Sequence, residues 1–160
     1  MNHITVSMLR QELQLHGATG VMVYRISTAA NGSGCEWGSF QTPRGLHRIR
    51  LKIGEGCPIN TVFVGRRPTG EVFSPAIPHD SKNRDWILSR ILWLEGLVPK
   101  LNRGGSVDTL RRHIYIHGTA DEHQLGMPVS HGCIRMANSD VIDLFDRVNT
   151  GSLVTIKKES

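Results

Sequence analysis

The sequence predicts a mainly β fold, with two packed sheets and one well-formed helix. Many short segments alternate apolar and polar residues, and turn-forming residues separate these segments. Only the segment that begins near residue 138 repeats its apolar residues with the period of a helix without fitting a strand equally well. No proline- or serine-rich linker and no internal repeat divides the chain, so residues 1–160 are predicted to form a single domain.

The first half of the chain is predicted to consist of strands. Three of them form a meander at residues 4–8, 11–15 and 21–26. A turn at residues 42–45 precedes residues 46–53, which alternate almost strictly. One face of that segment carries Leu46, Arg48, Arg50 and Lys52, and the more apolar face, which we expect to meet the core, carries His47, Ile49, Leu51 and Ile53.

Strands are also predicted in the second half, at residues 61–64 and 153–157. Residues 86–94 fit a helix and a strand equally well. In the alternating segment 113–117, Ile114 and Ile116 are expected to enter the core. The opposite face then carries His113, Tyr115 and His117.

One helix is predicted between segment 113–117 and segment 153–157. Asn138 or Ser139 is predicted to cap its start, and Gly151 is predicted to end it. Its apolar face carries Val141, Leu144, Phe145 and Val148.

Charge and composition exclude several classes of function. The net charge is +5, but the basic residues are scattered and do not interleave with aromatic residues, so no nucleic-acid partner is predicted. No apolar run approaches the roughly 18 residues that cross a bilayer, so no membrane partner is predicted either. Residues 1–7 do not resemble a signal peptide, which predicts a cytoplasmic protein if Met1 is the natural start and allows a periplasmic one if the N-terminus was trimmed.

The segment Ser130-His131-Gly132-Cys133-Ile134-Arg135 carries the strongest chemical signal. A thiolate is a good nucleophile, and an imidazole can take the proton of the thiol. His117 lies sixteen positions before Cys133, so we predict Cys133 as a nucleophile and His117 as its base. A nearby helix start and the cation of Arg135 are expected to lower the pKa of Cys133. Cys35 and Cys57 are interpreted as plain buried or loop thiols, because three cysteines cannot all pair within one chain.

Two alternatives stay open from the residues alone. His117, His131 and Cys133 could bind zinc, with His123 or Asp121 as a fourth ligand, although the usual zinc spacings are missing. The planar fork of Arg135 suits a substrate carboxylate, or else forms a salt bridge to Asp140 or Asp143. Tyr115 either lines a pocket or packs on the sheet, His113 is interpreted as a surface residue, and Arg112 is a weaker candidate cation.

Two motifs resemble the signature of L,D-transpeptidase catalytic domains, the YkuD-like family. The first is His117-Gly118-Thr119 followed by Ser130-His131-Gly132-Cys133-Ile134-Arg135-Met136, and the second is the turn Thr42-Pro43-Arg44-Gly45. The similarity spans most of the chain. It implies a β-sandwich of mixed sheets with one or two helices, and a cysteine at one end of a cleft.

The resemblance also implies a role for each site residue. Cys133 attacks, His117 takes its proton, and the carbonyl of Gly118 orients the His117 ring. The oxyanion is held by main-chain N–H groups around Gly132 and Cys133, with His131 and Ser130 in support. Arg135 and Tyr115 are the candidate substrate-binding residues, and neither a metal nor an organic cofactor is implied.

The implied substrate is the peptide stem of peptidoglycan or a soluble muropeptide. The bond that is cleaved joins residue 3, meso-diaminopimelate or lysine, to a terminal D-alanine. Its cleavage proceeds through an acyl-cysteine. For a cytoplasmic member we expect an L,D-carboxypeptidase of muropeptide recycling. The alternatives are a transpeptidase that forms 3→3 crosslinks or exchanges D-amino acids, and a non-enzymatic Cys/His metal-binding module.

Overall fold

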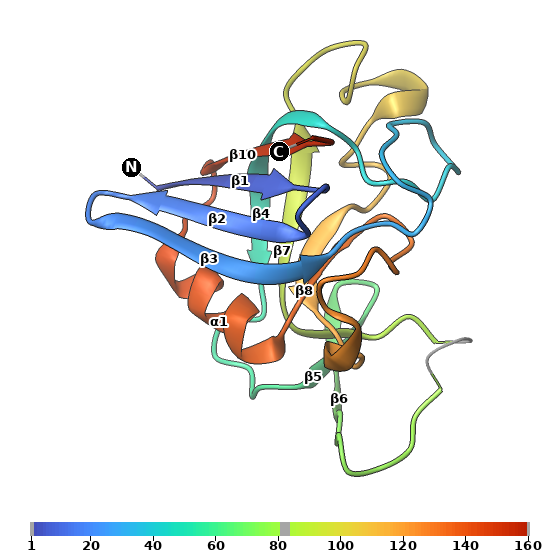
Figure 1. Ribbon diagram of the computed structural model, residues 1–160. Helices are drawn as coiled ribbons and strands as arrows, with labels where there is room; N and C mark the ends of the chain where they lie inside the picture. Colours follow the sequence, from blue (N-terminus) through green and yellow to red (C-terminus); the bar gives the residue numbers. More distant parts are fainter. Residues whose placement is uncertain (1, 81–83, 160) are drawn as a thin grey trace.

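The computed structural model describes residues 2–80 and 84–159, and ten strands and one α-helix dominate it (Figure 1). The predicted mainly β class is confirmed. The strands are β1 (His3–Ser7), β2 (Glu12–Gly17), β3 (Gly20–Ser27), β4 (Gly45–Ile53), β5 (Thr61–Val64), β6 (Arg67–Val72), β7 (Ile87–Gly96), β8 (Tyr115–Gly118), β9 (Ile134–Met136) and β10 (Leu153–Lys157). The helix is α1 (Asn138–Arg147), and short 3-10 turns lie at Gly105–Val107 and Glu122–Gln124.

All ten strands belong to one hydrogen-bonded network. Their order is β4-β10-β1-β2-β3-β9-β8-β7-β5-β6, and β4 also pairs with β7. This extra pairing closes eight of the strands into a ring, so the two layers are parts of one continuous sheet (Figure 1). The pairs β1–β10 and β8–β9 are parallel and the other pairs are antiparallel, which gives a mixed sheet.

Helix α1 packs on β7 and β8 and contributes its predicted apolar face to the main core. Val141, Leu144, Phe145 and Val148 are all buried. The predicted cap is wrong, because the N-cap position is Ala137 and no side chain of the helix caps it. Instead, the carboxylate of Glu122 accepts the N–H of Asn138 at 2.8 Å, so a distant segment supplies the acceptor.

Segment 86–94, which the sequence left open between a helix and a strand, is a strand and forms most of β7. One strand prediction needs correction. In β4 the alternation holds through Ile49, but a bulge follows, and Leu51 is exposed instead of meeting the core. Strands β6 and β9 were not predicted, because β6 is exposed throughout and β9 has only three residues.

His47 on β4 is fully buried, and its two ring nitrogens bond to the carbonyl of Gly45 and the hydroxyl of Thr109. Burial lowers the pKa of His47 to about 4. Between pH 6.5 and 4, His47 therefore binds a proton in the unfolded chain but not in the folded chain, so stability is lost as the pH falls through this window.

We expect His47 to make the free energy of unfolding fall by up to about 3 kcal/mol between pH 6.5 and 4. Urea denaturation at pH 7 and pH 4.5 measures this change. In His47→Gln the decrease should be smaller by the His47 contribution. An equal decrease in both proteins would show that other groups cause the acid sensitivity.

The described residues contain no helix with the length and apolar character needed to cross a lipid bilayer. Cys35, Cys57 and Cys133 are all free thiols.

Candidate active site

Strands β8 and β9 position the predicted nucleophile and base. They pair in parallel, with Ile116 opposite Ile134 and His117 opposite Arg135. Ile116 and Ile134 are fully buried in the core, so the alternating residues face the other way. Cys133 directly precedes β9 and therefore lies opposite Tyr115, one step along the same face from His117.

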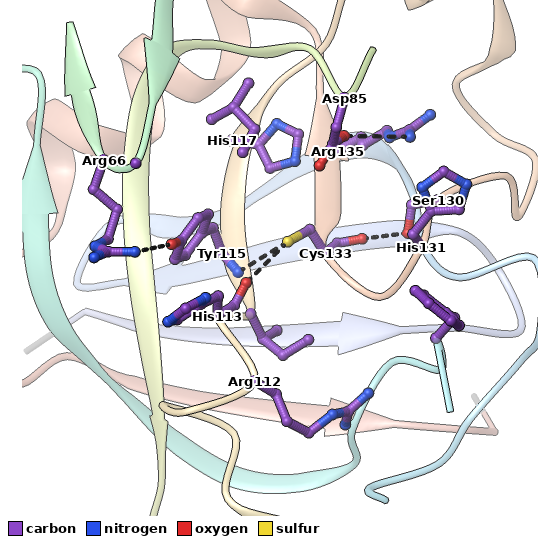
Figure 2. A pocket seen from close by; sticks show the side chains of 14 residues that line it. Arg66, Asp85, Arg112, His113, Tyr115, His117, Ser130, His131, Cys133 and Arg135 are labelled. Atoms are coloured by element: carbon purple, nitrogen blue, oxygen red, sulfur yellow. Dashed lines mark hydrogen bonds and ion pairs between the residues drawn. The ribbon is translucent and has the colours of Figure 1, made fainter. Parts of the chain in front are cut away.

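These side chains face one pocket of about 390 Å³ (Figure 2). Figure 2 shows the Cys133 sulfur in the middle, with the His117 ring and the Asp85–Arg135 pair on one side and Arg112 on the other. The lining includes six of the predicted site residues, namely Tyr115, His117, Ser130, His131, Cys133 and Arg135. The remaining two, Gly118 and Gly132, contribute main-chain groups.

The ring of His117 is held in one tautomer. Its Nδ1 lies 2.7 Å from the carbonyl oxygen of Gly118, which can only accept, so Nδ1 carries the proton. The Nε2 lone pair is then free to take a proton. A side chain at Gly118 would collide with the carboxamide of Asn138 and would lie 2.7 Å from the carbonyl oxygen of Leu88, which explains the glycine.

The sulfur of Cys133 contacts the main chain of β8 and the residues before it. The Tyr115 N–H donates to Sγ at 3.3 Å, and the thiol donates to the carbonyl oxygen of His113 at 3.4 Å. His113 is exposed, as predicted, and it also lines the pocket.

The expected lowering of the Cys133 pKa is wrong. Burial raises the pKa of this thiol to about 12, and it outweighs the N–H of Tyr115 and the cations of Arg135 and Arg112, which lower it. Strand β9 separates Cys133 from α1, so the helix start does not adjoin the sulfur. Burial also lowers the pKa of His117, so the resting pair is a thiol and a neutral imidazole.

The turn before β9 is fixed by the hydroxyl of Ser130. This hydroxyl donates to the carbonyl of Cys133 at 2.5 Å and accepts the N–H of Gly132 at 3.2 Å. Gly132 has φ 132°, a conformation that glycine adopts readily. Because the Gly132 N–H is already bonded, it is not free for an oxyanion as the resemblance implied, whereas the Cys133 N–H has no acceptor within residues 2–80 and 84–159.

The turn is also attached to the predicted Thr-Pro-x-Gly segment. The Thr42 hydroxyl donates to the carbonyl of Gly132 at 2.8 Å and accepts the N–H of Ala29 at 3.0 Å. Arg112 donates to the carbonyl oxygens of Gln41 and Gly34, at 2.6 and 3.2 Å. Arg112 therefore holds the loop between β3 and β4 against the pocket.

Two charged residues of the pocket were missed by the sequence analysis. Asp85 lies 4.0 Å from the guanidinium of Arg135, which therefore pairs with neither Asp140 nor Asp143. Arg66 stacks on the Trp93 ring and donates to the Tyr115 hydroxyl at 3.2 Å. Both come from loops far from β8 and β9 in sequence, and no local motif marks them.

No three His, Cys, Asp or Glu side chains of the described chain converge in a way that could hold a metal ion. The predicted zinc alternative of His117, His131 and Cys133, with His123 or Asp121, is therefore not assembled there. His131 instead meets the edge of the Phe40 ring, at 6.3 Å between ring centres.

A second cavity of about 280 Å³ adjoins the first. It shares Phe40, Arg112, Ile114 and His131 with the pocket around Cys133, and Trp37 and Gly38 complete its lining. Trp37 and Phe40 are mostly exposed, so two aromatic rings are open to a ligand beside the pocket.

The sequence is similar to curated proteins that are named as probable or putative L,D-transpeptidases. YbiS of Escherichia coli strain K12 is 46% identical over 125 residues, which cover 72% of this chain and 40% of YbiS. YkuD of Bacillus subtilis strain 168 is 48% identical over 48 residues, which cover 30% of this chain and 29% of YkuD. The matched stretches thus span less than half of these relatives.

Solved structures show that the fold is shared. L,D-transpeptidase 3 from Mycobacterium tuberculosis matches with a TM-score of 0.61 and 15% identity, over 98% of this chain and 60% of its own. An L,D-transpeptidase from Mycobacterium smegmatis matches with a TM-score of 0.56 and 16% identity, over 98% of this chain and 58% of its own. The profile of the YkuD L,D-transpeptidase catalytic domain family covers residues 1–156, and this chain belongs to that family.

Proposed function

We propose that this chain is a cysteine-dependent L,D-carboxypeptidase that removes the terminal D-alanine from tetrapeptide stems of soluble muropeptides. The observation that carries the proposal is the placement of Cys133 and His117 on one face of β8 and β9, in an accessible pocket. The ring of His117 is already oriented with its acceptor nitrogen free. This is the arrangement that an acyl-cysteine mechanism needs.

In the proposed reaction the sulfur attacks the carbonyl carbon of residue 3 while Nε2 of His117 takes the thiol proton. Because both groups are neutral at rest, proton transfer accompanies the attack. The Cys133 N–H donates to the oxyanion of the tetrahedral intermediate. His117 then returns the proton to the nitrogen of D-alanine, which leaves, and residue 3 remains as a thioester on Cys133.

Water completes the cycle. His117 takes a proton from the water as its oxygen attacks the thioester carbonyl, and the tripeptide leaves with a new carboxylate while the proton restores the thiol. A water molecule needs only about 30 Å³ of space. A pocket of about 390 Å³ is near the small end of ligand pockets, which favours a small acceptor once a stem peptide is bound.

The charge of the pocket also supports a stem peptide as substrate. Its lining carries the guanidinium groups of Arg66, Arg112 and Arg135 against the single carboxylate of Asp85. The end of a tetrapeptide stem carries several carboxylates, so a cationic pocket attracts it.

A transferase is the second candidate, and the adjoining cavity favours it. That cavity of about 280 Å³, bordered by Trp37, Phe40 and His131, has room for an amine acceptor beside the thioester. The acceptor would then form a crosslink or exchange the terminal D-amino acid.

Incubation with a disaccharide tetrapeptide, with and without a free D-amino acid, separates the two candidates. We expect the tripeptide and D-alanine in both mixtures, measured by liquid chromatography and mass spectrometry. A new amide or a crosslinked dimer as the main product would favour the transferase. Unchanged tetrapeptide in both mixtures would contradict both candidates.

We expect a carbapenem to acylate Cys133. An L,D-transpeptidase has been solved in complex with imipenem, and L,D-transpeptidase 3 carries a faropenem-derived adduct. Incubation with imipenem should add one drug-derived mass to the intact protein, and peptide mapping should place it on Cys133. Cys35 and Cys57 serve as internal controls. An adduct on either of them, or a drug-derived mass on the Cys133→Ala protein, would contradict site-directed acylation.

A further inference from the structure

Asp85 is the one carboxylate among the residues that line the pocket. Its side chain is 55% exposed, and its oxygen lies 4.0 Å from the guanidinium of Arg135, at the outer limit of an ion pair. A contact of this length is too long for a direct hydrogen bond, so Asp85 and Arg135 both keep capacity for a ligand. Figure 2 shows this pair facing the pocket next to the His117 ring.

The position of Asp85 is costly for the proposed chemistry. Its negative charge raises the pKa of Cys133, whose sulfur must become negative during attack. It also raises the pKa of His117, which favours the protonated base. A cation supplied by the substrate would offset the effect of Asp85 on the pKa of Cys133. A role in binding such a cation would therefore explain a carboxylate at position 85.

We propose that Asp85 and Arg135 together bind the amino-acid zwitterion at the end of the residue 3 side chain, and so select meso-diaminopimelate over lysine. This inference rests on the proposed function. The ammonium group of the zwitterion pairs with Asp85, and its carboxylate pairs with Arg135. The weak ion pair of the free protein is replaced by two closer ones.

The reach of the side chain fits the spacing of the residues. Cys133 and Arg135 are two positions apart on an extended segment, which places their Cα atoms roughly 6–7 Å apart at about 3.3 Å per residue. In diaminopimelate, four C–C bonds of about 1.5 Å separate the two amino-acid centres, a span of about 5 Å when extended. A residue 3 carbonyl at Cys133 therefore brings the distal centre close to Arg135 and Asp85.

Lysine and acetylated lysine test the two halves of the pair separately. Lysine keeps the ammonium group for Asp85 but offers Arg135 no carboxylate. Nε-acetyl-lysine has neither charge. If Arg135 instead bound the carboxylate of the terminal D-alanine, diaminopimelate and lysine peptides would bind with equal affinity.

Calorimetry of tetrapeptides on the Cys133→Ala protein measures binding without turnover. We expect diaminopimelate to bind about 10- to 100-fold more tightly than lysine, and lysine more tightly than Nε-acetyl-lysine. Adding Asp85→Asn should bring lysine and acetyl-lysine to within about twofold. Adding Asp146→Asn, the same change on an exposed part of α1, should keep the full order.

Equal affinities of the three peptides for Cys133→Ala would overturn the proposal. So would an Asp85→Asn variant that weakens all three equally, because that result describes an effect on the pocket and not on residue 3. D-Alanine release by the unmodified enzyme is measured separately. A binding preference without release would leave the zwitterion site standing and contradict the carboxypeptidase proposal.

Discussion

Replacement of Cys133 by alanine is expected to remove D-alanine release from a disaccharide tetrapeptide, with a loss of at least about 10⁴-fold in kcat/KM. The thioester cannot form without the sulfur, and no second thiol lines the pocket among the described residues. Chromatography of the released D-alanine measures the loss. Intact-protein mass spectrometry should at the same time lose the acyl-enzyme signal.

Cys35→Ala is the matched control, because Cys35 is also a largely buried free thiol but does not line the pocket. We expect its turnover to stay near that of the unmodified enzyme. Substantial turnover by Cys133→Ala would falsify the assignment of the nucleophile, whatever the behaviour of Cys35→Ala.

His117→Gln is expected to lower kcat/KM by about 10²- to 10⁴-fold, the usual contribution of a general base. The glutamine carboxamide can still meet the Gly118 carbonyl but cannot take the thiol proton at neutral pH. The pKa of His117 is lowered by burial, so the base is neutral at pH 7. In the unmodified enzyme the rate should fall only when the pH drops through that lowered value, and His117→Gln should lose this acid limb.

His123→Gln provides the comparison, since His123 is exposed and does not line the pocket around Cys133. His123 was also a candidate zinc ligand, so unchanged activity of His123→Gln would weaken the zinc hypothesis as well. A pH profile of His117→Gln with its acid limb intact would assign that limb to another group.

Period-two patterns predicted β1 and β2 well because one face of each of these strands is buried. Ile4, Val6, Leu13 and Leu15 are buried as their alternation indicates. The period-two pattern did not predict features of a strand that depend on its pairing with another strand. The bulge after Ile49 arises in the pairing with β7, and segment 86–94 becomes a strand because β4, β5 and β8 all pair with it.

The site was predictable only where its residues are close in sequence. Cys133, His117 and the residues beside them come from the paired strands β8 and β9 and carry a local motif. Asp85 and Arg66 reach the pocket through the tertiary fold. The sign of the pKa change was wrong for a related reason, since sequence neighbours show charges such as Arg135 but not the burial that outweighs them.

The high resting pKa of Cys133 has a consequence for chemical damage. Peroxides and simple alkylating agents react with thiolates, and a thiol with a pKa of about 12 is almost entirely protonated at neutral pH. The sulfur therefore reacts slowly with general electrophiles in solution. It reacts readily only with a molecule bound in the pocket, where His117 takes the thiol proton during the attack. Effective covalent inhibitors should therefore owe their potency to fit in the pocket more than to intrinsic reactivity.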